Sequence, residues 1–71
     1  MKTAQVDGQT VQIGDWVGFK SDIEQSGQIV GIKSSHMGKA LVLENKNGFH
    51  GDYIGGQEIT TELARDCWLE G

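Results

Sequence analysis

The sequence has little of what small domains use for covalent or metal reinforcement. Its 71 residues include one cysteine and two histidines, so no disulfide can form within the chain, and the composition offers no structural metal site. A chain of this length holds one small hydrophobic core. We therefore expect a single domain over residues 1–71, with no cofactor, that works in a reducing compartment such as the cytoplasm.

Long apolar runs are also missing. The first eight residues, Met1 to Gly8, lack the apolar segment of a signal peptide, and no stretch approaches the roughly 20 apolar residues that a membrane span needs. We expect a cytoplasmic protein that has no membrane partner.

Positive charge is scarce, and negative charge is unevenly placed. Residues 1–49 contain five lysines and five acidic residues, whereas residues 50–71 contain Arg65 and five acidic residues, which accounts for the net charge of -4. Polyanions are bound through clustered cations, so this balance disfavours a general DNA or RNA binder. The acidic C-terminal third, Asp52 to Glu70, instead suits a basic surface on a partner protein.

Proline is absent, and glycine is abundant with 11 residues. The glycines are mostly spaced singly between β-branched and aromatic residues, which indicates tight turns and bent strands and not a flexible linker. No segment longer than about eight residues keeps the helical period of 3.6. The sequence therefore predicts an all-β protein.

The first half of the chain contains the clearest strand and turn signals. Asp7-Gly8 lies between two alternating segments and predicts a small hairpin. Alternation predicts strands over residues 16–20 and 28–33, and polar composition predicts loops over residues 21–26 and 34–39. Apolar residues on both faces of the 28–33 segment indicate a central, strongly curved strand.

The middle of the chain predicts a second pair of strands. Residues 40–44 alternate as a strand, and residues 45–48 form a tight turn with two asparagines and a glycine. Residues 49–54 are expected to pair back across that turn.

The C-terminal segment predicts one helical turn and a last strand. The turn is expected over residues 59–65, with Thr60 or Thr61 as its N-cap, and the strand over residues 66–70. These elements describe a small five-stranded SH3-like β-barrel with one short helical turn before the last strand, whose closure removes exposed edges. An OB-fold is the alternative, although it usually needs longer strands. The expected core contains Ile13, Val17, Phe19, Val30, Ile32, Leu41, Leu43, Ile54, Ile59, Leu63 and Cys67.

The pattern Gly14-Asp15-x-Val17-x-Phe19, followed by Gly27-x-Ile29-Val30-x-Ile32, resembles the opening of SH3-like barrels of the KOW and Tudor type. Residues 61–68 fit the helical turn and last strand of the same architecture, and the size of the chain is similar to that of small SH3-like proteins encoded by tailed bacteriophages. The resemblance implies a binding module. KOW members bind RNA, ribosomes or transcription complexes, and Tudor-like relatives bind peptides or modified side chains.

Two departures from these families bear on the ligand. Asp22 and Glu24 stand where a loop that faces phosphates would carry lysine or arginine, which weakens the inference of nucleic-acid binding. A Tudor-like cage needs several aromatic side chains around one cation, and the sequence has five aromatic residues in all.

The candidate binding residues are aromatic and basic. Trp16 lies on the strand face opposite Val17 and Phe19, so it is either an exposed stacking platform or covered by a neighbouring segment. The lysines either line one rim of the barrel or simply keep the surface solvated. The candidate binding set is Trp16, Lys20, Lys33, Lys46, Phe49 and Tyr53, with Lys39 as a further cation on that rim.

An enzyme is the least favoured function. His50 and Asp52 are two residues apart and would point the same way on a strand, but no third ligand lies at close spacing. Cys67 has acidic neighbours, which raise the pKa of a thiol, so we expect a buried structural cysteine with no catalytic role. A filled barrel of this length also leaves little room for a substrate pocket.

We expect a non-catalytic interaction module that binds a protein partner, such as one of the transcription, translation or nucleic-acid-handling machinery. The alternative is weak binding of RNA or single-stranded DNA through Trp16 and the face formed by Lys20, Lys33 and Lys46. We expect a monomer or a weak homodimer.

Overall fold

The structure is a computed structural model that describes residues 2–70 and is mostly β. Its elements are β1 (Thr3–Val6), β2 (Gln9–Gln12), β3 (Trp16–Ser21), β4 (Ile23–Ser35), β5 (Gly38–Glu44), β6 (Ile59–Leu63), the 3-10 turn η1 (Ala64–Asp66) and β7 (Trp68–Leu69). No helix in this part of the chain is long and apolar enough to cross a membrane. The prediction of an all-β protein with one helical turn before the last strand is confirmed.

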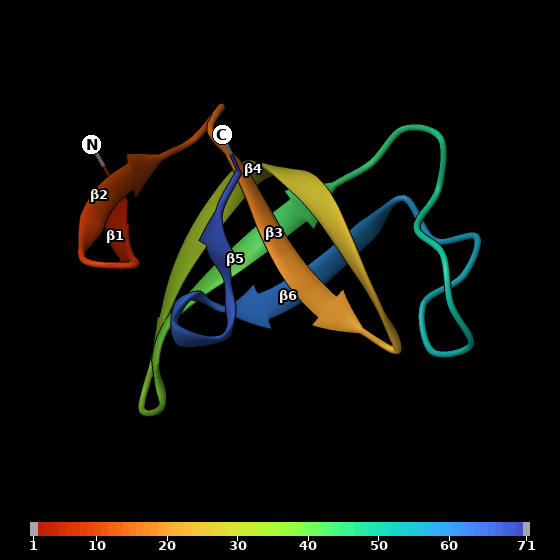
Figure 1. Ribbon diagram of the computed structural model, residues 1–71. Coiled ribbons are helices and arrows are strands. Elements are labelled where there is room, and N and C mark those ends of the chain that lie inside the picture. Colours follow the sequence, from red (N-terminus) through yellow and green to blue (C-terminus); the bar gives the residue numbers. More distant parts are fainter. Residues whose placement is uncertain (1, 71) are drawn as a thin grey trace.

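The strands form two antiparallel sheets. One has five strands in the order β6-β5-β4-β3-β7, and β1 and β2 form a separate two-stranded hairpin. β6 and β7 are the outer strands of the larger sheet, and no hydrogen bonds between them close it. The predicted closure that removes exposed strand edges is therefore wrong for the described residues. β4 arches through the middle of this sheet, and the hairpin and the loop between β5 and β6 lie at opposite ends of it (Figure 1).

The hairpin predicted at Asp7-Gly8 is confirmed. Val6 lies opposite Gln9, which leaves two residues for the turn. Asp7 and Gly8 both have positive φ, 53° and 77°, as a type I′ turn requires, and the twist of this turn matches that of the paired strands. The side chain of Val6 points into the core.

The polar loops predicted over residues 21–26 and 34–39 are wrong. β3 and β4 pair up to Ser21 opposite Ile23, so Asp22 alone forms the turn, with φ of 73°. At the other end, β4 and β5 pair up to Ser35 opposite Gly38. Both hairpin ends carry exposed side chains, so their polar composition reflects contact with solvent and not a break in the strands.

β4 bends at a bulge, where its register with β5 shifts between Ile29 and Gly31. Val30 is the extra residue, and it changes which side chains face the core. Ile29 and Ile32 are buried, whereas Val30 is 39% exposed. The assignment of Val30 to the core is therefore wrong, because it assumed strict alternation through the bulge. β4 is the central strand, as predicted.

The strand predicted over residues 49–54 is absent. The turn at residues 45–48 is confirmed, since Gly48 N–H donates to Asn45 O at 2.9 Å, but the chain then closes a loop on itself, with Phe49 N–H donating to Gln57 O at 2.7 Å. The Phe49 ring packs edge-to-face on Phe19, with ring centroids 5.4 Å apart. Burial of this ring holds the start of the loop in the core.

β6 occupies most of the segment predicted as a helical turn. Ile59 and Leu63 are four residues apart, so they share a face in either a helix or a strand. The segment is a strand because it pairs with β5. The 3-10 turn follows at Ala64–Asp66 with Leu63 at its N-cap and no side-chain cap. The N-cap role predicted for Thr60 or Thr61 is therefore wrong.

The core is filled by Ala4, Val6, Val11, Val17, Phe19, Ile29, Ile32, Leu41, Leu43, Phe49, Ala64 and Cys67. Five of the predicted core residues lie elsewhere. Ile13, Val30 and Ile59 are exposed, Leu63 is half-buried, and Ile54 packs only partly against the core. Their places are taken mainly by the hairpin, by Ile29 and by Phe49.

Candidate functional site

Two tryptophans share the outer face at the β3–β7 end of the sheet. Gly18 pairs with Trp68, and Trp16 lies two residues before Gly18 on the same strand, so all three point to one side. Trp16 is 51% exposed, and Trp68 is half-buried. We call Trp16, Gly18 and Trp68 the tryptophan face.

Gly18 lets the C-terminal strand lie directly against β3. A Cβ atom at Gly18 would meet Trp68 Nε1 and a carboxylate oxygen of Glu70, so the indole and the carboxylate both lie against the glycine backbone. The binding set predicted from the sequence contains Trp16 but not Trp68, and it includes Glu70 only as the end of the acidic segment Asp52 to Glu70. The pairing of β7 with β3 is a long-range contact, but the alternation of Trp16 with Gly18 signals space for a neighbour.

A shallow groove of about 380 Å³ lies beside Trp16. Its lining is Gln9, Thr10, Val11, Gly14, Asp15, Trp16, Leu69 and Glu70. Among the described residues that line it there are two carboxylates and no lysine or arginine. Asp15 Oδ2 accepts a hydrogen bond from Gln12 N–H at 2.9 Å, which fixes its position. An exposed indole next to two carboxylates favours a cationic ligand.

The structure does not bring the candidate lysines together. Lys20 lies opposite Glu24 near the start of β4, whereas Lys33 lies opposite Ala40 near the far end of β4. The expected rim of lysines is therefore split, because antiparallel pairing sends the end of β3 and the end of β4 in opposite directions. Lys46 is exposed in the turn after β5.

The two candidate aromatic residues of the β5–β6 loop have opposite surroundings. Phe49 is 2% exposed, so its ring is not available as a stacking surface and belongs to the core. Tyr53 is 74% exposed and does not line the groove beside Trp16. Its loop lies at the end of the sheet away from the hairpin (Figure 1). Of the candidate set, Trp16 and Lys20 alone share one strand face.

Cys67 is buried after the 3-10 turn, and its Sγ lies 3.4 Å from Leu63 O. Burial, with smaller contributions from the negative charges of Glu62 and Asp66, raises the pKa of Cys67 to about 12. The thiol therefore stays protonated and weakly nucleophilic at neutral pH.

His50 and Asp52 do not share a strand. Their backbone amides fasten the β5–β6 loop to the β3–β4 hairpin: His50 N–H donates to Gln25 Oε1 at 2.8 Å, and Asp52 N–H donates to Asp22 Oδ2 at 3.1 Å. Within residues 2–70 no three His, Cys, Asp or Glu side chains are grouped closely enough to hold a metal ion.

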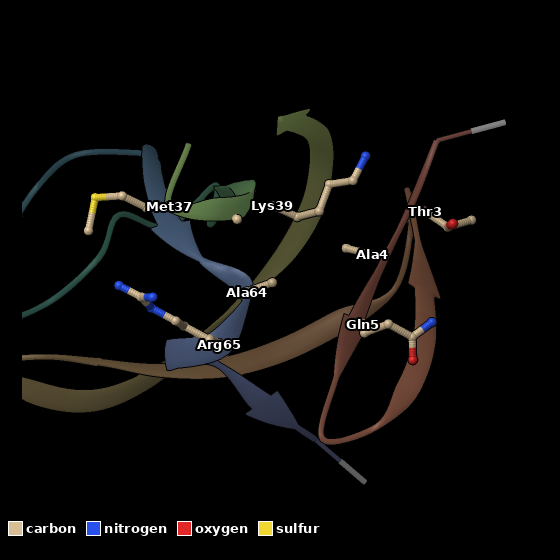
Figure 2. A pocket seen from close by; sticks show the side chains of 8 residues that line it. Thr3, Ala4, Gln5, Met37, Lys39, Ala64 and Arg65 are labelled. Carbon is tan, nitrogen blue, oxygen red and sulfur yellow. The ribbon is translucent and has the colours of Figure 1, made fainter. Parts of the chain in front are cut away.

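A second groove, of about 450 Å³, lies between the hairpin, the β4–β5 turn and the 3-10 turn. Ala4 and Ala64 face each other across it, while the charged ends of Lys39 and Arg65 point in different directions (Figure 2). Lys39 Nζ donates to Ser34 Oγ at 3.2 Å. Because Lys39 and Arg65 point apart, they do not form a joint site for an anion. The groove beside Trp16, where two carboxylates adjoin an exposed indole, is therefore the better candidate for binding a charged ligand.

No family model matches the chain, and the searches of curated proteins and of solved structures found no match either.

Proposed function

We propose that this chain is a non-catalytic interaction module that binds a basic segment of a partner protein at the tryptophan face and the adjoining groove. The observation that carries the proposal is the exposed indole of Trp16 beside the carboxylates of Asp15 and Glu70. Arginine and lysine side chains are attracted both to the face of an indole and to carboxylates. The net charge of -4 favours the same kind of partner.

We also propose that the five-stranded sheet is an SH3-like barrel of the KOW or Tudor type. In support, the sheet has five strands, β4 is bent at a bulge, and the 3-10 turn stands before the last strand. The resemblance of residues 14–32 to the opening of such a barrel and of residues 61–68 to its end points the same way. The size of the chain, similar to that of small SH3-like proteins of tailed bacteriophages, supports a bacteriophage-encoded protein, and the single cysteine supports a cytoplasmic one. Within this group the groove chemistry favours a peptide ligand over RNA.

Chemical-shift titration of the backbone amides and the indole N–H groups tests the function. We expect a short peptide rich in arginine and glycine to shift the signals of Trp16, Asp15 and Glu70, with an affinity that decreases as salt is added. We expect Trp16→Ala to weaken this binding by about tenfold, as loss of a cation–π contact does. A single-stranded oligonucleotide should leave the spectrum unchanged.

Tyr53→Ala is the matched control, since it removes an exposed aromatic side chain outside the groove, and we expect it to leave peptide binding unchanged. Oligonucleotide shifts at Lys20, Lys33 and Lys46 that vanish with salt would favour the nucleic-acid alternative instead. If the peptide shifts other signals but leaves those of Trp16 unchanged, the proposal is contradicted.

A further inference from the structure

A second outer surface covers β4, β5 and β6, and Val42 lies at its centre between Gly31 and Thr61. The row at one end contains Glu44 and Ile59, and the row at the other end contains Lys33 and Leu63. Val42 lies between these rows on β5. We call this surface the β4–β6 face: Val30, Lys33, Val42, Glu44, Ile59 and Leu63.

On β6, apolar side chains lie on the outer side of the sheet and a carboxylate lies on the inner side, the reverse of the usual arrangement in a sheet with one face in water. Antiparallel sheets of that kind place apolar side chains inward and polar ones outward. On β6 the polar Glu62 shares its side of the sheet with the fully buried Leu41, whereas Ile59 and Leu63 lie on the outer side, with Thr61 between them. Ile59 is 45% exposed. Such an arrangement is typical of an outer face that is covered in an assembly.

We propose that the β4–β6 face binds a second copy of the chain around a two-fold axis that lies in the interface and crosses the strands at Val42. This rotation places Val42 against Val42 of the second copy. It also exchanges the two end rows, so Ile59 of each copy lies over Leu63 of the other. A two-fold interface is self-complementary in this way, and the two sheets pack face to face with aligned strands.

The charges of the face select this axis. Exchange of the end rows brings Glu44 of each copy to the level of Lys33 of the other, on neighbouring strands. The pairing occurs twice because of the symmetry. A two-fold axis parallel to the strands would instead place Lys33 over Leu63, which buries a charge against an apolar side chain. The proposal does not depend on the ligand of the tryptophan face.

Sedimentation equilibrium with the full-length chain tests the dimer up to a concentration of about 1 mM, where weak interfaces are populated. We expect a monomer–dimer equilibrium. Lys33→Glu alone and Glu44→Lys alone should each raise the dissociation constant by about tenfold through like-charge contacts. The double variant should return it to near the original value, because the two charges are exchanged.

Val42→Lys and Ile59→Lys should each abolish the dimer, and amide spectra show which of them stays folded. Lys20→Glu is the matched control, since it makes the same charge change outside this face and should leave the dissociation constant unchanged. A monomer at every concentration would overturn the proposal. So would a dimer that is insensitive to both lysine substitutions, or a double charge variant that associates less than either single variant.

Discussion

Glu62 lies opposite Leu41 on the inner side of β6, in partly buried surroundings. Burial raises the pKa of Glu62 above its usual value of 4.5. The hydrogen bond that Thr60 Oγ1 donates to Glu62 Oε2, 3.4 Å long, opposes this shift, and the negative charge of Asp66 adds to it. The ionised carboxylate is therefore less stable in the fold than in the unfolded chain.

We expect Glu62→Gln to raise the free energy of unfolding at neutral pH. Because the pKa of Glu62 is higher in the folded state, the folded chain binds more protons as this group titrates. Its contribution to stability is thus present below the unfolded pKa and is lost as pH rises through the folded pKa. Urea unfolding at pH values from 4.5, the usual pKa, to about 7 should show that the advantage of the variant grows with pH.

Glu58→Gln is the control for this experiment, because Glu58 is exposed just before β6. We expect its stability to follow that of the original chain across the same pH series. A Glu62→Gln variant that loses stability relative to the original chain as pH rises would contradict the inferred burial of the carboxyl.

At the scale of single residues, the sequence predicted side-chain exposure only where strand alternation was undisturbed. Trp16, Val17 and Phe19 alternate as expected, with Trp16 on the outer face. Phe49 and Tyr53 occur in one loop of similar composition, and nothing local distinguishes the buried ring from the exposed one. Phe49 is buried because its ring contacts Phe19, and this contact joins two distant parts of the chain.

The bulge in β4 is the element that shapes the sheet. On both sides of Val30 the register with β5 is regular, and Ile29 and Ile32 both face the core. A bulge adds bend and twist to its strand, and here it lets one long strand pair with β3 at one end and with β5 along the other.

We expect deletion of Val30 to destabilise the fold by about 2 kcal/mol or more, a size typical of losing a specific backbone device. The deletion would leave Ile29 and Ile32 on the inner face, since Gly31 would then follow Ile29 in a continuous register. The loss in free energy of unfolding would therefore measure the contribution of the bend, because no core residue is misplaced. Urea unfolding below the concentration at which the chain associates measures it.

Val30→Ala separates the bulge from the side chain. It keeps the extra residue and truncates a partly exposed valine, so we expect a loss of less than about 1 kcal/mol. Equal losses for the deletion and for Val30→Ala would show that the bend contributes little to stability.

At the scale of elements, local turn chemistry was predictable and strand pairing over longer distances was not. The Asp7-Gly8 hairpin and the turn at residues 45–48 follow from residues that tolerate positive φ. The strand over residues 59–63 was mistaken for a helical turn, because Ile59 and Leu63 fit both periods. Its pairing with β5 across the intervening loop settles its conformation.

At the scale of the whole molecule, the hairpin and the larger sheet share one core. Ala4, Val6 and Val11 pack in the same hydrophobic cluster as the central strands. The carboxylate of Asp7 accepts a hydrogen bond from Leu69 N–H at 3.0 Å, so the hairpin turn also caps β7. The two sheets exchange no strand hydrogen bonds, and their coupling depends on these side chains.

Because the core is shared, we expect the hairpin and the sheet to unfold as one cooperative unit. Val6 is among the largest fully buried side chains, so Val6→Ala should lower the free energy of unfolding by about 2 kcal/mol. Hydrogen exchange measures how this loss is distributed: the slowest amides of β4 and β5 should lose protection by the same free energy, since they exchange through global unfolding. Thr3→Ala, an exposed change on the same strand, should leave them unaffected. If Val6→Ala instead speeds exchange in β1 and β2 alone, the hairpin is an appendage, and the larger sheet is stable without it.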